Sequence, residues 1–239
     1  MTRESGCTMK ARLISEVKAV TFDDFFTLRH PIGQGNDIIY PILKALKKEG
    51  VHVDDDKFLK QYSRENERYR KALKETLRES LLDDLVMNAL TTCGYESRNT
   101  SETVKEAVDY GIATQKARWF PNSKNTLLLL RKKGYKLGLI SNTHWRVSRN
   151  LRQEFRRFFQ VVTLSYEHGY AKPHPSIFIA TLTKLGTKAS QCLHVGDDPI
   201  ADMQGAKSVG MKTAFIKRKE VETDADIQIK RLIELTTIL

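Results

Sequence analysis

The chain has 239 residues, of which 40% are hydrophobic and 29% charged, and its formal net charge is +11 at pH 7. This length and composition predict a globular protein with a substantial core. No apolar run approaches the ~20 residues of a membrane span, so we expect no membrane partner.

The chain begins with a polar segment, residues 1–16, which lacks the apolar stretch of a secretory signal. We interpret this segment as an N-terminal extension. The three cysteines (Cys7, Cys93 and Cys192) are scattered and form no metal-binding spacing. Because isolated thiols are typical of a reducing compartment, these features predict a cytoplasmic protein.

A buried strand is predicted over residues 18–23, and the pattern then becomes helical from about residue 36 to residue 120. Apolar residues at helical spacing predict helices over residues 38–46 and 81–90, with a long charged helix between them. After Pro121 the pattern changes to an alternation of helices and apolar strands. The predicted helices span residues 122–133, 145–159, 176–185 and 200–209, and the strands residues 136–141, 161–165, 192–196, 213–217 and 227–229.

This alternation predicts an α/β fold with a doubly wound parallel sheet. The strand at residues 18–23 must belong to the same sheet, so the helical block is an insertion. We therefore expect an α/β core domain of residues 17–31 and 121–239, with an inserted all-helical domain of residues 32–120.

The positive charge is mostly dispersed along the sequence, with both signs mixed at helical spacing. One local cluster lies on the predicted helix 145–159, and we interpret it as a solvated helix face. No recognised nucleic-acid-binding motif accompanies it, so no nucleic-acid partner is expected. The cluster consists of Arg146, Arg149, Arg152 and Arg156.

Polar residues follow apolar strands in four patches of the sequence. In an open parallel sheet, the loops after the carboxyl ends of neighbouring strands converge on one crevice. Acidic groups, a small hydroxyl and a lysine would then share a pocket, which suits magnesium-assisted phosphoryl transfer to a carboxylate. The residues in question are Asp23, Ser141, Asn142, Lys172, Asp197 and Asp202.

With these motifs in this order, the sequence from about residue 17 to the C-terminus resembles the haloacid dehalogenase-like (HAD) hydrolases. The first motif of that family, D-x-D-x-T/V, matches Asp23 with Thr27, whereas Asp24 has Leu28 as its fourth neighbour. The later motifs are a serine or threonine after a strand, a lysine, and an acidic pair. They match Ser141 followed by Asn142, Lys172, and Asp197 with Asp202.

The resemblance implies a Rossmann-like core, a helical cap of the C1 type that closes over the site, and Mg²⁺ as cofactor. It also implies that Asp23 attacks phosphorus and forms an aspartyl-phosphate. Asp202 would bind the cation through water or orient Lys172. The expected catalytic residues are Asp23, Ser141 and Lys172, and the expected phosphate-binding residues are Ser141, Asn142 and Lys172. The expected Mg²⁺ ligands are Asp23, the backbone oxygen of Phe25, Asp197 and Asp202.

One position departs from the family pattern. Family phosphatases carry a second aspartate two residues after the nucleophile, where it protonates the leaving alcohol, and this chain has Phe25 there. A phenylalanine cannot transfer a proton, and general acid–base catalysis contributes typically ~10²–10⁴ in rate. The adjacent Phe26 also replaces a residue that is usually small.

Three interpretations follow from this departure. The first is a magnesium-dependent phosphatase of small phosphorylated metabolites with weakened proton transfer. The second is a 2-haloacid dehalogenase, because those relatives carry an aromatic residue where Phe25 stands, although they usually lack the acidic pair kept here as Asp197 and Asp202. The third is a non-catalytic or regulatory protein on the same scaffold. We favour the first, and the oligomeric state stays open.

Several polar residues near these motifs are given structural roles. Asp198 is expected to cap the helix that follows Pro199. His144, His168 and His174 are expected to be surface or loop residues.

Overall fold

The computed structural model describes residues 16–32, 38–77, 82–95, 99–114, 117–143, 153–218 and 220–239. Most of the predicted N-terminal extension lies outside the described residues. So do His144 and three of the arginines of the predicted basic cluster, at positions 146, 149 and 152.

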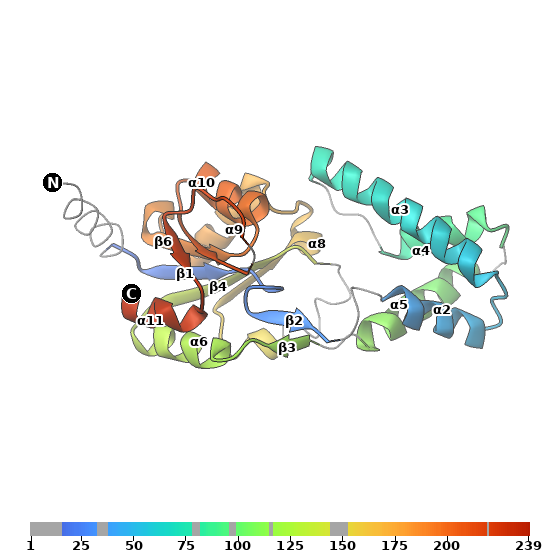
Figure 1. The fold of residues 1–239 in the computed structure, drawn as a ribbon, viewed down its shortest axis with the longest axis horizontal. Coiled ribbons are helices and arrows are strands. Elements are labelled where there is room, and N and C mark those ends of the chain that lie inside the picture. The colour runs from blue at the N-terminus through green and yellow to red at the C-terminus, as the bar shows by residue number, and fades with distance from the viewer. Residues whose placement is uncertain are drawn as a thin grey trace.

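A six-stranded, all-parallel sheet forms the middle layer of the α/β domain, as the alternation of helices and apolar strands predicts (Figure 1). Its strand order is β5-β4-β1-β6-β7-β8, so the first strand of the chain lies in the middle. The strands are β1 Ala19–Phe22, β4 Lys136–Ser141, β5 Val161–Leu164, β6 Cys192–Gly196, β7 Lys212–Ile216 and β8 Ile227–Ile229.

Helices cover both faces of this sheet, α9 and α10 on one face and α6 and α11 on the other (Figure 1). Polar or small side chains alternate with large apolar ones along β1 and β6, and this alternation sorts them between the two faces. The helices are α6 Ser123–Lys132, α9 Pro175–Leu185, α10 Gly205–Ser208 and α11 Leu235–Ile238.

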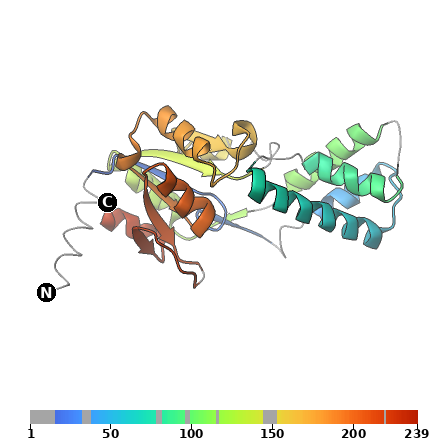
Figure 2. The same ribbon diagram turned by 90° about the horizontal axis from the view of Figure 1, so that it is seen from above.

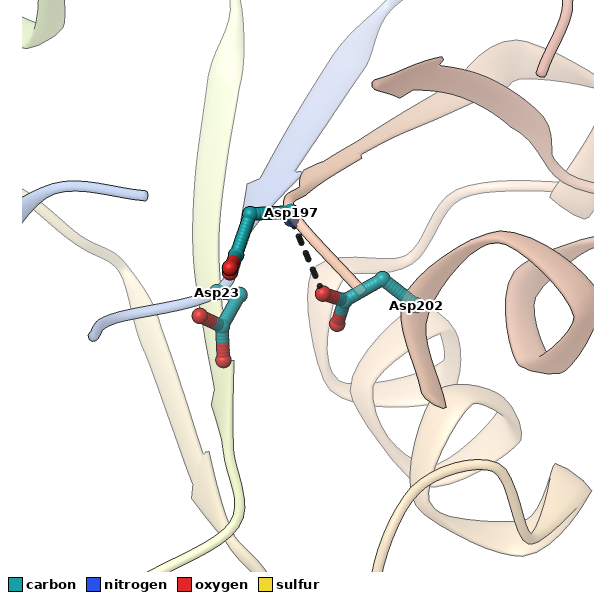
Figure 3. Close-up of side chains that lie close together, drawn as sticks. All are labelled: Asp23, Asp197 and Asp202. Carbon is teal, nitrogen blue, oxygen red and sulfur yellow. Dashed lines mark hydrogen bonds between the residues drawn. The ribbon is translucent and has the colours of Figure 1, made fainter. Parts of the chain in front are cut away.

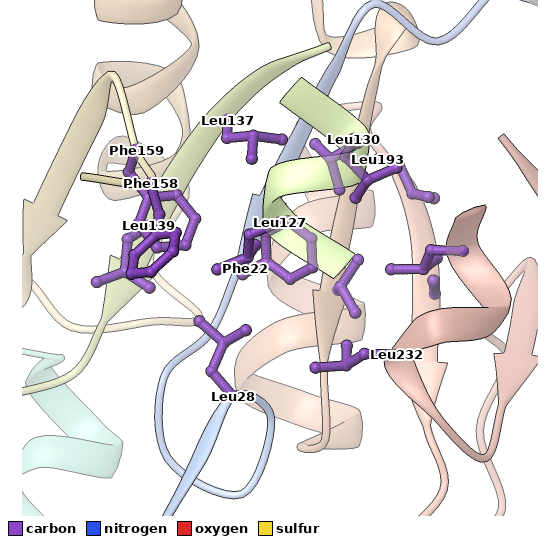
Figure 4. Close-up of a cluster of buried hydrophobic side chains, with 14 of the residues drawn as sticks. Phe22, Leu28, Leu127, Leu130, Leu137, Leu139, Phe158, Phe159, Leu193 and Leu232 are labelled. Carbon is purple, nitrogen blue, oxygen red and sulfur yellow. The ribbon is translucent and has the colours of Figure 1, made fainter. Parts of the chain in front are cut away.

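The larger core lies on the face covered by α6 and α11 (Figure 4). Phe22 of β1 and Leu193 of β6 pack there with leucines of α6 and a group of phenylalanines at residues 155–159. On the opposite face a smaller cluster joins Ala19 and Cys192 to α9 and α10. Burial on both faces explains why these strands appear in the sequence as short continuous apolar runs.

The helical block between β2 and β3 forms a separate bundle beside the sheet (Figures 1 and 2). It has its own hydrophobic cluster, drawn from residues 39–112. This arrangement agrees with a helical cap inserted after the first strand, and the domain boundaries at residues 32 and 120 stay a prediction. The helices are α2 Ile39–Lys48, α3 Asp55–Thr76, α4 Leu82–Thr92 and α5 Thr100–Thr114.

The prediction of helix throughout residues 36–120 is wrong at its end. Residues Ala117–Trp119 form strand β3, which pairs antiparallel with β2, Arg29–Pro31. Strands of three residues are too short to show a hydrophobic period, and this pairing joins segments almost ninety residues apart. The two segments that connect the sheet to the helical block are thus held side by side.

Two further elements differ from the prediction. The helix predicted over residues 200–209 is a π-helix, Pro199–Gln204, followed by the short α10. A short helix α8, Ser165–His168, follows β5 directly. Within the part of the chain that the structure describes, no helix combines the length and apolar character needed to cross a membrane.

Candidate active site

The candidate site lies at the carboxyl ends of β1, β4 and β6. Because the chain passes from β1 to one side of the sheet and later returns to the other side, β1 marks the point where strand order reverses. Ligands of open α/β sheets bind outside the carboxyl ends of the strands at such a point. Asp23 follows β1, Ser141 ends β4 and Asp197 follows β6, so the structure brings these three predicted residues to one edge.

Lys172 binds two of the predicted carboxylates directly. Its Nζ donates to Oδ1 of Asp23 and to Oδ1 of Asp202, at 2.6 Å in both cases. All three side chains are largely buried. The lysine therefore fixes the orientation of the predicted nucleophile.

Asn142 holds the backbone of Lys172 from both sides. Its Oδ1 accepts from the Lys172 backbone N–H at 2.7 Å, and its Nδ2 donates to the Lys172 carbonyl at 3.0 Å. The Asn142 amide, which was predicted to bind phosphate, therefore holds the loop that carries the lysine.

Three carboxylates meet at this edge of the sheet (Figure 3). One oxygen from each of Asp23, Asp197 and Asp202 lies within 4.8 Å of the others. When all are ionised, the single charge of Lys172 leaves a surplus of two negative charges. Carboxylate oxygens in such a group are the ligands that Mg²⁺ prefers, and a divalent cation would offset the surplus. The donor set therefore fits the predicted magnesium site.

The ionisation of these groups reflects burial and their neighbours. Burial raises the pKa of Asp23 to about 8 against the opposing charge of Lys172, and burial together with Asp202 raises the pKa of Asp197 to about 6. Burial would also raise the pKa of Asp202, but Lys172 and His194 hold it well below its ordinary value. Burial acts to lower the pKa of Lys172, yet its two carboxylate partners raise it further, so the lysine stays charged.

The loop after β1 presents Phe25 where the family places its second aspartate. The Phe25 ring is partly buried, and the guanidinium of Arg29 lies 5.4 Å from its centroid. Phe26 has a φ of 62°, in the left-handed region that favours glycine, and its side chain is exposed. This backbone conformation gives a physical reason why a small residue is usual there.

Two residues hold this loop in place. Thr27 Oγ1 donates to Oδ1 of Asp197 at 3.2 Å, which joins the loop to the acidic group after β6. Arg218, just beyond β7, donates to the carbonyls of Phe26 and Thr27 at 2.8 and 3.1 Å. The Arg218 guanidinium also stacks on Phe120, 3.7 Å from the ring centroid.

Asp24 has a structural role, which agrees with its exclusion as the nucleophile. It is fully buried and accepts from Nε of Arg29 at 2.7 Å and from Nη2 at 2.5 Å. The third arm of the guanidinium, Nη1, donates to Glu154 at 2.9 Å. Glu154 also accepts from the indole of Trp119 in β3, so this network links the site to the β2–β3 pair.

His194 is a further polar residue beside the site, and it was not predicted as a site residue from the sequence. It lies fully buried in β6, where Nδ1 is 2.9 Å from Oγ1 of Thr21 and Nε2 is 3.2 Å from Oδ1 of Asp202. Burial lowers its pKa. A histidine inside an apolar strand is a visible signal, because a polar group buried there requires a partner.

Two of the remaining polar residues, Asp198 and His174, lie at helix starts, whereas His168 is the last residue of α8. Asp198 Oδ1 accepts from the N–H groups of Ile200 and Ala201, and so it caps the π-helix as predicted. His174 caps α9, and its Nδ1 lies 2.7 Å from the hydroxyl of Ser176, which His168 also contacts.

Comparison with known proteins places this geometry in a family context. A family model of haloacid dehalogenase-like hydrolases matches residues 17–210. The chain is 38% identical over 133 residues to glyceraldehyde 3-phosphate phosphatase of Pyrococcus furiosus, covering 51% of this chain and 55% of that protein. It is 30% identical over 133 residues to ribulose-1,5-bisphosphate 5-phosphatase of Halopiger xanaduensis, covering 50% and 56%. The chain thus spans about half the length of the curated relatives it matches.

Solved structures with the same fold include both kinds of enzyme discussed above. A 2-haloacid dehalogenase from Pseudomonas syringae pv. tomato has a TM-score of 0.69 at 25% identity, covering 93% of this chain and 97% of that one. A HAD phosphatase from Thermococcus onnurineus has a TM-score of 0.58 at 25% identity, with the same coverage. On the match to the family model, which extends over most of its length, the chain belongs to the haloacid dehalogenase-like hydrolase family.

Proposed function

We propose that the protein is a Mg²⁺-dependent phosphatase that hydrolyses small phosphorylated metabolites. The observation that carries this proposal is the group formed by Asp23, Asp197 and Asp202 around Lys172. An enzyme that displaces halide from carbon has no use for a divalent cation, whereas phosphoryl transfer to a carboxylate needs one. The phosphatase names of two relatives support the same conclusion.

In this proposal an oxygen of Asp23 attacks phosphorus and forms an acyl-phosphate bond, while the bond from phosphorus to the ester oxygen breaks. The ester oxygen leaves with the bonding electron pair and becomes an alcohol by taking a proton from solvent water. Water then attacks the phosphorus of the aspartyl-phosphate, which releases inorganic phosphate and restores the carboxylate. Lys172 and the hydroxyl of Ser141 would stabilise the phosphoryl oxygens.

The cation, when bound, would offset the charge of the phosphoryl group and of the attacking carboxylate. Asp23, Asp197 and the backbone oxygen of Phe25 would hold it, with Asp202 bound through water or directed to Lys172. Thr27 would keep Asp197 in place through the hydrogen bond between them.

Phe25 is expected to slow both steps of the proposed reaction. Since position 25 supplies no proton, esters with a poor leaving group should react slowly, whereas p-nitrophenyl phosphate, whose leaving group needs no proton, should react faster. The second step also lacks its usual base, so an aspartyl-phosphate should accumulate at Asp23. Rapid quenching and mass spectrometry would detect the adduct.

The decisive experiment is a screen of phosphate esters with and without Mg²⁺, with Asp23→Asn as the matched control. We expect turnover that requires both the cation and Asp23. Turnover that persists in Asp23→Asn, or equal rates for aryl and alkyl esters, would contradict the proposed mechanism.

A second candidate function is 2-haloacid dehalogenation, favoured by Phe25 and by the likeness to a dehalogenase structure. Metal-independent release of halide from 2-chloropropionate would promote it over the phosphatase. A protein that is inert towards both substrate classes, even as Phe25→Asp, would favour the third interpretation, a regulatory protein on this scaffold.

A further inference from the structure

A polar pair lies inside the sheet, directly below the candidate site. Thr21 of β1 and His194 of β6 are register partners on neighbouring parallel strands, so their side chains leave the same face. Both are fully buried, and 2.9 Å separates Oγ1 of Thr21 from Nδ1 of His194. Asp23 lies two residues beyond Thr21, just past the end of β1, and is connected to the pair through Asp202 and Lys172. The pair is therefore the inner end of a polar line that leads to the predicted nucleophile.

The donors and acceptors along this line can be assigned from their chemistry. An ionised carboxylate only accepts hydrogen bonds, so Nε2 of His194 must carry the proton that it donates to Asp202. In the neutral ring Nδ1 then accepts, and the hydroxyl of Thr21 donates to it. Thr21 thereby selects the tautomer that presents an N–H group to Asp202.

Asp202 is fully occupied by protein donors. Its Oδ1 accepts from Lys172 at 2.6 Å and from His194 at 3.2 Å. Its Oδ2 accepts from the backbone N–H groups of Asp197 and Asp198, at 3.1 Å each. A carboxylate offers about four acceptor positions, so these four donors saturate it. Asp202 was predicted either to bind the cation through water or to orient Lys172. Because its acceptor positions are filled by protein donors, the second role is favoured.

We propose that His194 is a positioning residue that fixes the carboxylate of Asp202, and through it the ammonium of Lys172 against Asp23. Without the N–H group of His194, Oδ1 of Asp202 keeps Lys172 as its single partner, and the carboxylate is then oriented only by that bond and by the two backbone N–H groups on Oδ2. Lys172 would then lose one of the two carboxylates that hold its Nζ in place. The inference rests on the proposed phosphatase function, since Lys172 matters there as the group that meets the phosphoryl oxygens.

The packing around the imidazole is suited to such a role. The ring of Phe178 in α9 meets it edge-on, with centroids 5.3 Å apart and planes at 90°. Gly205 lets α10 approach this phenylalanine, because a Cβ there would lie 2.7 Å from the Phe178 ring. The imidazole is therefore confined, and its N–H group has a fixed direction.

The test compares two replacements of His194. His194→Leu removes the donor at similar volume, whereas His194→Gln keeps an N–H group at similar reach. Thr181→Val is the matched control, because it breaks another buried side-chain bond, from Thr181 to Thr163 at 2.8 Å, in which neither Asp202 nor Lys172 takes part. For each protein one measures kcat and KM with p-nitrophenyl phosphate, the affinity for inorganic phosphate in the presence of Mg²⁺ by calorimetry, and Tm.

We expect His194→Leu to lower kcat by about 10–100-fold, the range typical when a partner that orients a site residue is lost. It should also weaken phosphate binding several-fold, and His194→Gln should recover most of both. Thr181→Val should change Tm but neither activity nor phosphate binding. The inference is overturned if His194→Leu stays within twofold of the unmodified protein in both readouts, if His194→Gln fails as badly as His194→Leu, or if Thr181→Val loses as much.

Failure of the phosphatase proposal is a separate outcome. If the unmodified protein hydrolyses no ester, that proposal fails, and phosphate binding alone then decides the role of His194. If the unmodified protein is active and His194→Leu is equally active and binds phosphate equally well, the function stands and the inference about His194 falls.

Discussion

Replacement of Arg29 by methionine should destabilise the protein by about 3–4 kcal/mol at pH 7. Arg29 is the charged partner of Asp24, which has no exposed surface and receives two hydrogen bonds from the guanidinium. Methionine keeps much of the apolar stem but leaves a buried carboxylate without a counter-charge. Loss of one partner of a buried ion pair typically costs about 3–5 kcal/mol.

The electrostatic part of this destabilisation has an upper limit, because Asp24 can take up a proton instead of staying charged. Its ordinary pKa is 3.8, and burial already raises the pKa in the folded protein. Protonation of such a group at pH 7 costs about 1.4 kcal/mol for each of roughly three pH units, or about 4 kcal/mol. The electrostatic part of the loss cannot exceed this figure.

The destabilisation caused by Arg29→Met depends on pH. An acid whose pKa is raised by folding binds its proton more readily in the folded state, so the folded variant gains stability as the pH falls. The folded-state pKa of Asp24 differs between the unmodified protein and Arg29→Met. As the pH falls from the higher of these two values to the lower, the difference in unfolding free energy between the two proteins should shrink by about 1.4 kcal/mol per pH unit.

Urea unfolding at pH 5 and pH 7 measures this deficit, and the double variant Asp24→Asn/Arg29→Met is the control. The double variant should regain stability at pH 7 and lose the pH-dependent part of the deficit. A deficit below 1 kcal/mol for Arg29→Met, or one that does not change with pH, would refute the reasoning.

Three further predictions concern the site. Phe25→Asp should raise the rate with alkyl phosphates by about 10²–10⁴-fold because it supplies the missing proton donor; Phe25→Asn is the control, and an equal gain in both would count against this role. Asp198→Ala should lower the free energy of unfolding in urea by about 1 kcal/mol, as the loss of a helix cap does, and leave phosphate hydrolysis intact. Asp197→Asn should abolish phosphate hydrolysis. If Asp198→Ala abolished hydrolysis and Asp197→Asn did not, the roles of the two residues would be exchanged. Gly196→Ala should abolish activity, because the added Cβ would lie 2.2 Å from Cγ of Asp202; normal rates in a protein of native circular dichroism would contradict this steric argument.

Much of the sheet could be predicted because its central strands are buried on both faces. The apolar runs of β4 and β6 have clear ends, and the structure gives both the predicted bounds. The short β2 and β3 could not be predicted, since a three-residue strand has no periodicity and depends on a distant partner. The π-helix could not be predicted either, because over six residues the spacing of apolar side chains in a π-helix cannot be distinguished from that in an α-helix.

The candidate site also contains residues that could be predicted from the sequence and one that could not. Asp23, Lys172, Asp197 and Asp202 were predicted from the family motifs and from the convergence of strand ends, and in the structure their side chains lie close together. The role of His194 depends on the register between β1 and β6, which join residues more than 170 positions apart. The register between two strands cannot be predicted from a single sequence. A polar residue in an apolar strand therefore indicates that it has a partner but not which residue that partner is.

The two-sided grip of Asn142 on Lys172 has a consequence for the energetics of substrate capture. With both the N–H and the carbonyl of Lys172 bound by one amide, the main chain at this point has little freedom left. Its ordering entropy is lost when the protein folds rather than when an anion arrives. An incoming anion would thus meet an ammonium that is already in place, and more of the contact energy would appear as affinity.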